Sequence, residues 1–463
     1  MYGKRHNEKA YDYLFALFTT VFVTLKYHDL FLPYFWDELG VYSRAALYLA
    51  QNKLSLFPSA LPPELSRGHP LLFSYLFGIA YRLFGYEVTS GHILSLFITI
   101  VLLLVVYRKT ALHFNKLTGL GAIVILTVQP VFYAQSTMVL PEMLLSLLVF
   151  VSLILYYEKK MWHFAFFSSA AILVKESAIV LPATVIAYSI INRIIVKEKD
   201  DRLSIQSISL SLIPLIVFGL FLIVQKVENG WFFFPLHIGF VSFNPETILK
   251  SNHNYQNFLF FHQGRYWWVK VFLAAGLLLL LKGKVKWSDR LVTLFVLFGL
   301  IFLAFCSINF YMDRYTLPLF PIITILLAAS LYSIYTNKWF NIIAFTALAI
   351  LSFKDMDTGY FNYDCDMGFK HHLSVEQQTL SYVEKIASKE DTLIANFPLN
   401  FVIDGQYTGF NFHNLKSKPL EKHKTLYITT SNTEVYLPNY NSLKLLQKFN
   451  ESYAEGCVFE KIK

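Results

Sequence analysis

Long apolar runs separated by short polar and charged segments fill residues 1–353. A helix that crosses about 30 Å of hydrocarbon needs roughly 20 residues, and fewer where protein covers its ends. The apolar runs therefore predict about eleven membrane-spanning helices, two of them short and separated by a break at Lys175. They are expected at residues 11–35, 92–107, 117–133, 140–157, 162–195 (as two short helices), 205–225, 266–281, 291–308, 317–335 and 339–353.

Residues 37–85 have a different pattern. Apolar positions recur at helical spacing, and four prolines follow. This pattern predicts interfacial helices rather than a simple loop. Segment 71–84 is apolar but short, and it contains Arg82. We expect it to lie along the interface, since the cations that follow residue 107 reach the cytoplasm only if this segment does not cross.

Charge sets the predicted orientation. The formal net charge is +9, and Lys and Arg gather in the short segments between apolar runs, as topology signals do. We therefore discount nucleic acid as a partner. The amino end is basic and precedes an apolar run with no small-residue cleavage site, which predicts a retained first span with a cytoplasmic amino end. A composition that is 55% hydrophobic and 15% charged indicates a multi-pass protein of the cell membrane, surrounded by lipid.

Residues 354–463 are polar and charged. Helical periodicity at 374–388 and strand patterns at 392–396, 401–404 and 425–429 predict a small α/β domain. With eleven spans, this domain lies outside the cytoplasm. The chain has three cysteines and no Cys-x-x-Cys pair, which gives no indication of a zinc site. Cys365 and Cys457 both fall in the extracytoplasmic domain, where they could form a disulfide.

Eight chemically active residues fall at the same predicted outer boundary of the membrane: Asp37, Glu38, His69, Glu142, Lys175, Glu176, Arg314 and Tyr315. An ionisable group that faces lipid at depth costs at least about 2.5 kcal/mol, so we expect them to face a cavity. Carboxylates beside cations suit a phosphate-linked substrate. The cations hold the phosphate, and a carboxylate accepts a proton or binds a divalent metal ion. Asp37 is the candidate base for an inverting sugar transfer.

Structural alternatives stand beside these assignments. Glu142 could be a first-turn acid at a helix N-terminus, and Arg314 could mark the membrane boundary. Lys175 and Glu176 could pair with each other, and His69 and His237 could serve as local hydrogen-bonding groups. At the level of the whole chain, the same charges could line the path of a transporter or lipid-binding protein, or belong to a catalytically inactive scaffold.

Several short motifs, taken in order, resemble the polyprenyl-phosphate-dependent glycosyltransferases of the GT-C type, such as the protein O-mannosyltransferases and the aminoarabinose transferases that modify lipid A. The resemblance covers roughly residues 34–321. Two motifs depart from it: Pro141 precedes the second acid, and His-Pro-Leu replaces the commoner His-Pro-Pro. The motifs are Asp37-Glu38, Arg67-Gly68-His69-Pro70-Leu71, Tyr81-Arg82-Leu83-Phe84-Gly85, Pro141-Glu142, Leu173-Val174-Lys175-Glu176 and Arg314-Tyr315-x-Leu317-Pro318.

The resemblance implies an α-helical polytopic enzyme. It would move a hexosyl or pentosyl group from a polyprenyl-phosphate carrier to a lipid, glycan or protein acceptor on the outer face of the membrane. Catalytic roles fall to Asp37, Glu38 and Glu142, and donor-phosphate contacts to Lys175, Arg314, Tyr315 and Arg67. His69 and His237 are further site candidates, and Asp37 with Glu142 is the candidate pair for a divalent metal ion.

Overall fold

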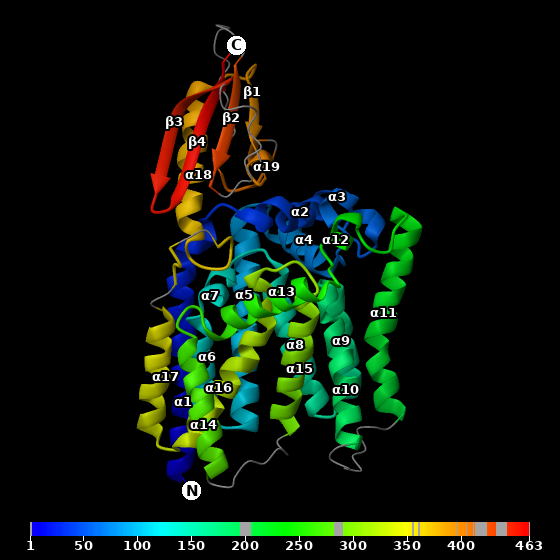
Figure 1. Ribbon diagram of the computed structural model, residues 1–463, viewed down its shortest axis with the longest axis vertical. Helices are drawn as coiled ribbons and strands as arrows, with labels where there is room; N and C mark the ends of the chain where they lie inside the picture. Colours follow the sequence, from blue (N-terminus) through cyan, green and yellow to red (C-terminus); the bar gives the residue numbers. More distant parts are fainter. Residues whose placement is uncertain are drawn as a thin grey trace.

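The structure is a computed structural model, and it describes residues 2–194, 205–281, 290–353, 356–359, 362–395, 397–403, 405–410, 412, 424–431 and 442–462. A bundle of apolar helices forms its larger part, and a small α/β domain stands on one end of the bundle (Figure 1). This arrangement confirms the predicted fold class, an α-helical multi-pass membrane protein with a small carboxyl-terminal domain.

Apolar side chains cover the outside of the bundle as well as its core. Leu17, Leu220 and Leu300 are about 60% exposed (62%, 57% and 62%) on three different helices. Such a surface suits contact with lipid chains rather than water. The helices of the bundle are α1 (Tyr2–Lys26), α5 (Val88–His113), α6 (Lys116–Thr127), α8 (Pro141–Tyr157), α9 (Met161–Val174), α10 (Val180–Ile194), α11 (Ile205–Asn229), α14 (Tyr266–Leu281), α15 (Arg290–Ser307), α16 (Phe320–Ile334) and α17 (Lys338–Phe353).

Short helices lie across the end of the bundle that carries the α/β domain, which we call the capped end (Figure 1). Arg82 has hydrogen-bond partners here: its Nε and Nη2 donate to the carbonyl oxygens of Ala50 and Asn52, at 2.6 and 2.8 Å. These bonds satisfy carbonyls at the end of a neighbouring helix. The segment that contains Arg82 thus lies beside that helix, as expected of an interfacial helix. The elements are η2 (Glu38–Tyr42), α2 (Ser43–Gln51), η3 (Pro58–Ala60), α3 (Pro63–Ser66) and α4 (Leu72–Phe84).

The bounds of two predicted spans differ from the observed helices. α1 ends at Lys26, and a short 3₁₀ helix, η1 (Tyr27–Phe31), carries the first span to Phe31. The span predicted at 117–133 breaks after Thr127, because Pro130 begins a new short helix, α7 (Pro130–Gln135). Between the spans predicted at 205–225 and 266–281, the structure has two further helices, α12 (Pro235–Ile238) and α13 (Pro245–Phe260).

The α/β domain packs one helix, α18 (Phe369–Ile386), against a four-stranded sheet of order β1-β2-β4-β3. β1 (Thr392–Ala395) is parallel to β2 (Thr425–Thr430), and β4 (Ala454–Lys461) is antiparallel to both β2 and β3 (Leu443–Glu451). The predicted strands at 392–396 and 425–429 match β1 and β2 within the described residues. The strand predicted at 401–404 is wrong, since residues 400–403 form a helical turn, α19 (Asn400–Ile403), and Asp404 lies outside the described residues.

Buried polar contacts fasten this domain to the bundle. Lys26 of α1 and Lys370 of α18 both bind the carboxylate of Asp29, and Tyr34 donates its backbone N–H to the carbonyl of Thr408 at 3.0 Å. Gly40 permits close approach, because a Cβ there would lie 2.2 Å from a ring carbon of Phe397. Residues of the α/β domain can therefore line a cavity at the capped end.

The disulfide that the sequence left open between Cys365 and Cys457 does not form. Cys365 and Cys457 are both free and buried, Cys365 in the segment between α17 and α18 and Cys457 on strand β4. Sequence position alone gave no measure of their separation.

Candidate active site

A cavity of about 1370 Å³ opens at the capped end. One part of its wall carries Asp37, Glu142 and Lys175, and another part is made of aromatic and aliphatic side chains from α11 and α15. Trp36, Tyr363 and Phe397 complete the wall next to Asp37, and the last two come from residues beyond the bundle. The site is thus built by both parts of the chain.

The backbone around Asp37 is held in an uncommon conformation. Trp36 has a φ of 49°, in the left-handed region, which costs a non-glycine residue about 1–2 kcal/mol. The Trp36 ring packs on Tyr363 and Phe397, with centroid distances of 4.9 and 5.2 Å. This packing offsets the strain and turns Asp37 into the cavity, where its side chain is 19% exposed. Strain of this kind is concentrated at functional sites.

Arg314 lies behind the cavity wall and is buried. Its Nη2 donates to Asp37 and its Nη1 to Asp364, while its Nε lies 3.4 Å from Oε1 of Glu142. The guanidinium of Arg314 therefore interacts with three carboxylates. The resemblance implied that Arg314 contacts the donor phosphate, but the structure places it outside the cavity lining, where it fixes the acids that face the cavity.

Lys175 occupies the predicted break. Its backbone is extended, with φ −156° and ψ 133°, which ends α9 before η4 (Glu176–Ile179) begins. Its Nζ donates to Oε1 of Glu142 at 2.7 Å and lies 4.0 Å from the centre of the Tyr315 ring. The prediction of two helices broken at Lys175 is confirmed. The alternative that Lys175 and Glu176 pair with each other is wrong, because each of them binds another partner.

The side chain of Glu38 makes buried hydrogen bonds within the fold and does not face the cavity. It is buried, its Oε1 is bonded to Nε2 of His92 at 2.9 Å and accepts from the N–H of Val139 at 2.6 Å, and its Oε2 accepts from the N–H of Phe35 at 3.2 Å. Glu38 does not line the cavity. The structure thus separates the two adjacent acids and corrects the catalytic role expected for Glu38.

Asp364 is a site residue that the sequence did not reveal. It is buried in the segment between α17 and α18, far in sequence from Arg314 and Asp37. Burial is the main cause that raises its pKa to about 7; Arg314 opposes this rise, and Asp37 and Glu142 add to it. The three carboxylates and two cations of this cluster carry one excess negative charge when all are ionised. With its raised pKa, Asp364 can take up the balancing proton.

Stability should therefore depend on pH through Asp364. Its pKa is higher in the folded protein, about 7, than the roughly 3.9 of an unfolded aspartate, so the folded state binds the proton more tightly. This contribution to stability is fully present below about pH 4 and is lost as the pH rises through about 7. We expect this contribution to lower the thermal unfolding midpoint progressively between about pH 4 and 7, and Asp364→Asn to flatten that fall. An identical pH profile in both proteins would contradict this assignment.

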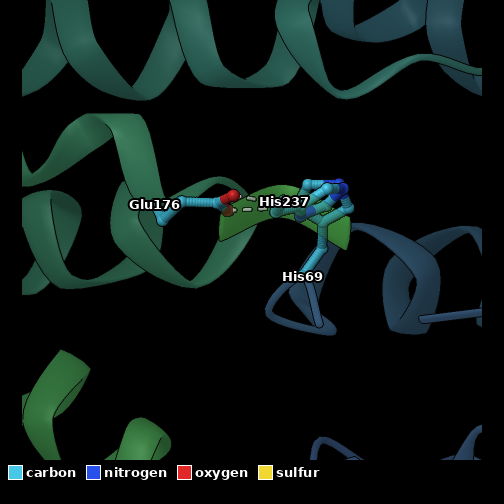
Figure 2. A group of neighbouring side chains, drawn as sticks. All are labelled: His69, Glu176 and His237. Atoms are coloured by element: carbon cyan, nitrogen blue, oxygen red, sulfur yellow. Dashed lines mark hydrogen bonds and ion pairs between the residues drawn. The ribbon is translucent and has the colours of Figure 1, made fainter. Parts of the chain in front are cut away.

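His69, Glu176 and His237 all line the cavity, and Figure 2 shows that their side chains lie next to one another. Nδ1 of His69 lies 3.0 and 3.2 Å from the two carboxylate oxygens of Glu176, and the rings of the two histidines are 4.8 Å apart. Burial, and to a smaller extent the neighbouring His69, lower the pKa of His237 to about 4. Arg67 also lines the cavity, with its guanidinium carbon 5.8 Å from the centre of the Phe397 ring.

The pair Asp37 and Glu142 does not suit the divalent metal ion expected there. Both carboxylates already face the guanidinium of Arg314, and Glu142 also binds Lys175. A dication bound between them would lie beside two fixed positive charges. A metal ion would need a donor set elsewhere in the cavity.

Comparison with known proteins supports the resemblance. The model of the Dolichyl-phosphate-mannose-protein mannosyltransferase family matches residues 68–224, and no curated protein matches the chain. The crystal structure of ArnT from Cupriavidus metallidurans bound to undecaprenyl phosphate aligns with a TM-score of 0.59 and 12% identity, over 97% of this chain and 98% of that one. The apo structure of the same protein aligns with a TM-score of 0.56 and 11% identity, over 96% and 98%. The solved structures thus show the same fold over nearly the whole chain, and the family model supports the resemblance over residues 68–224.

Proposed function

We propose that the protein takes a sugar from a polyprenyl-phosphate carrier and transfers it to a hydroxyl of a lipid, glycan or protein acceptor on the outer face of the membrane. The observation that carries this proposal is the cavity, which joins a cluster of carboxylates and cations to a long apolar wall. A polyprenyl phosphate has the same division into an anionic head and an apolar chain.

The apolar wall suits the carrier chain. Phe218 and Phe221 of α11 face the cavity together with Phe302 and Phe305 of α15. Each CH₂ group that an isoprenoid chain buries there contributes about 0.8 kcal/mol. The bound undecaprenyl phosphate in the similar ArnT structure supports a carrier of this kind.

The charged part of the cavity suits the phosphate. Lys175 and Arg67 both line it, and Lys175 can offer a donor to an anion while it stays beside Glu142. A lysine ammonium binds phosphate as a compact point charge. Tyr315 packs on Lys175, which narrows the directions in which the ammonium can point.

The reaction follows from this placement. The acceptor oxygen attacks C1 of the sugar, and Asp37 takes the hydroxyl proton as the bond to C1 forms. The bond between C1 and the phosphate oxygen breaks, and its electron pair stays on the phosphate, whose charge Lys175 stabilises. Attack opposite the leaving group gives inversion at C1. The role of Arg314 is to hold the carboxylate of Asp37 in this orientation.

A transporter would place its charges near the middle of the bilayer. Here Glu142 lies in the first turn of α8, and Lys175 lies at the break between α9 and η4, both against the cavity at the capped end. This placement at helix ends favours the enzyme over the transporter.

Lys175→Gln tests the donor site. The amide can still donate to Glu142, but the positive charge is gone, and a hydrogen bond to a charged group contributes about 1.5–3 kcal/mol. We expect the KM for the lipid-phosphate donor to rise by about 10- to 150-fold and less carrier lipid to co-purify, measured by transfer kinetics and mass spectrometry. Lys109→Gln is the control, since Lys109 pairs with Glu158 away from the cavity. An unchanged donor KM would remove Lys175 from the site.

A further inference from the structure

Three potential metal ligands converge from separate parts of the chain. His69 comes from the loop before α4, Glu176 from the break between α9 and α10, and His237 from α12 (Figure 2). One ligand atom of each lies within 4.8 Å of the others, and all three residues are half-buried in the cavity wall. The hydrogen bond between His69 and Glu176 explains that pair, but it does not explain why His237 joins them.

The segment that carries His237 makes few polar contacts with the bundle among the described residues. α12 has no buried residue, and large apolar side chains on both sides of it are exposed, among them Phe233 at 51% and Phe243 at 77%. Two hydrogen bonds tie the segment at its flanks, from Gln225 to the carbonyl of Phe232 and from Ser242 to the carbonyl of Ile308. A bound ion at His237 would fix the middle of the segment to the bundle.

The donor set has the chemistry of a zinc site. Two imidazoles and one carboxylate are nitrogen and oxygen ligands typical of Zn²⁺, and three protein ligands leave one position open. Bonds of about 2.0–2.1 Å place tetrahedral ligand atoms about 3.3 Å apart, so the present spacing must close by roughly 1–1.5 Å. His237 lies on a short exposed turn and can make this movement. Mg²⁺ and Ca²⁺ prefer sets made of oxygen alone.

We propose that His69, Glu176 and His237 bind a divalent transition-metal ion, Zn²⁺ foremost, with its open position toward the cavity. The site ties the loop of α12 to the bundle. If the proposed function holds, on which this second role rests, the ion also adds positive charge next to Lys175, where the donor phosphate would bind.

The test uses the full-length protein in detergent, stripped with a chelator and then dialysed against ZnCl₂. We expect one zinc per chain by elemental analysis and a higher unfolding temperature with zinc than without it. His237→Gln should lose both effects, while His253→Gln should keep both, since His253 is an exposed histidine on α13 that bonds only to Asn257 among the described residues. Stoichiometric zinc in His237→Gln, or none in the wild type, would overturn the site.

A variant that fails to fold does not block the test. Co²⁺ added to the stripped wild-type protein should give the visible absorption of a tetrahedral nitrogen and oxygen site, and Zn²⁺ should remove it. Absence of that band would also overturn the proposal. Zinc binding without sugar transfer would support the metal site and refute the proposed function. Full sugar transfer by a protein that binds no zinc would refute the metal site and support the proposed function.

Discussion

Asp37→Asn is expected to abolish sugar transfer in a protein that still folds. Asparagine keeps the shape of the side chain but cannot accept the acceptor's proton, and general-base catalysis contributes about 10²- to 10⁴-fold to a rate. Folding should survive, because Asp37 is partly exposed and Arg314 keeps its contacts with Asp364 and Glu142. The measurement is transfer from a polyprenyl-phosphate sugar by purified protein, alongside the unfolding temperature.

Glu64→Gln is the matched control for this experiment. Glu64 is an exposed acid on α3, within the same segment at the capped end, and it does not line the cavity. The control should transfer sugar at the wild-type rate. Carrier lipid should still co-purify with Asp37→Asn, since the donor cations are intact. Turnover at the wild-type rate in Asp37→Asn would refute the role of Asp37 as the base.

Hydropathy predicts the bundle well where a helix is apolar along its whole length. The prediction at 266–281 coincides with α14, and the break at Lys175 is observed, because a charged residue inside an apolar run needs a cavity or a helix end. α13 was not predicted, because most of its residues are polar and only Tyr255, Phe258 and Leu259 are buried. Strand β3 was not predicted, because both of its faces are largely exposed and its apolar and polar residues alternate only weakly.

The candidate site shows more clearly what the sequence alone cannot predict. The sequence favoured Asp37 over Glu38 as the base, but it could not show how the two side chains are directed. Their directions depend on the left-handed backbone at Trp36 and on ring packing by Tyr363 and Phe397. Asp364 was missed for a related reason. It reaches Arg314 only through the path of the chain between α17 and α18, and its polar surroundings in sequence gave no sign of burial.

These contacts give the α/β domain a direct part in the site. Asp364 binds the buried Arg314, and Phe397 packs on Trp36 and lines the cavity. The domain is therefore more than a cover for the capped end. Tyr363 and Phe397 line the cavity together with Asp37, so we propose that this domain takes part in acceptor binding.

Arg314→Gln is expected to destabilise the protein strongly. Removal of one partner of a buried ion pair costs about 3–5 kcal/mol, and here three carboxylates lose the guanidinium that they share. Adding Asp364→Asn removes one of the unpaired charges, so the double variant should regain part of the lost unfolding temperature. Asp364→Asn alone is the control for that change. An unfolding temperature in Arg314→Gln equal to that of the wild type would contradict the network.

Kinetics of the same double variant separate two roles for Arg314. If Arg314 positions Asp37, as its burial behind the cavity wall indicates, kcat should fall by at least tenfold while the KM for the donor changes less. If it bound the donor phosphate directly, the KM would rise and kcat would change little. The double variant does not restore the contact between Arg314 and Asp37 that orients the base. Sugar transfer should therefore stay low even where folding recovers.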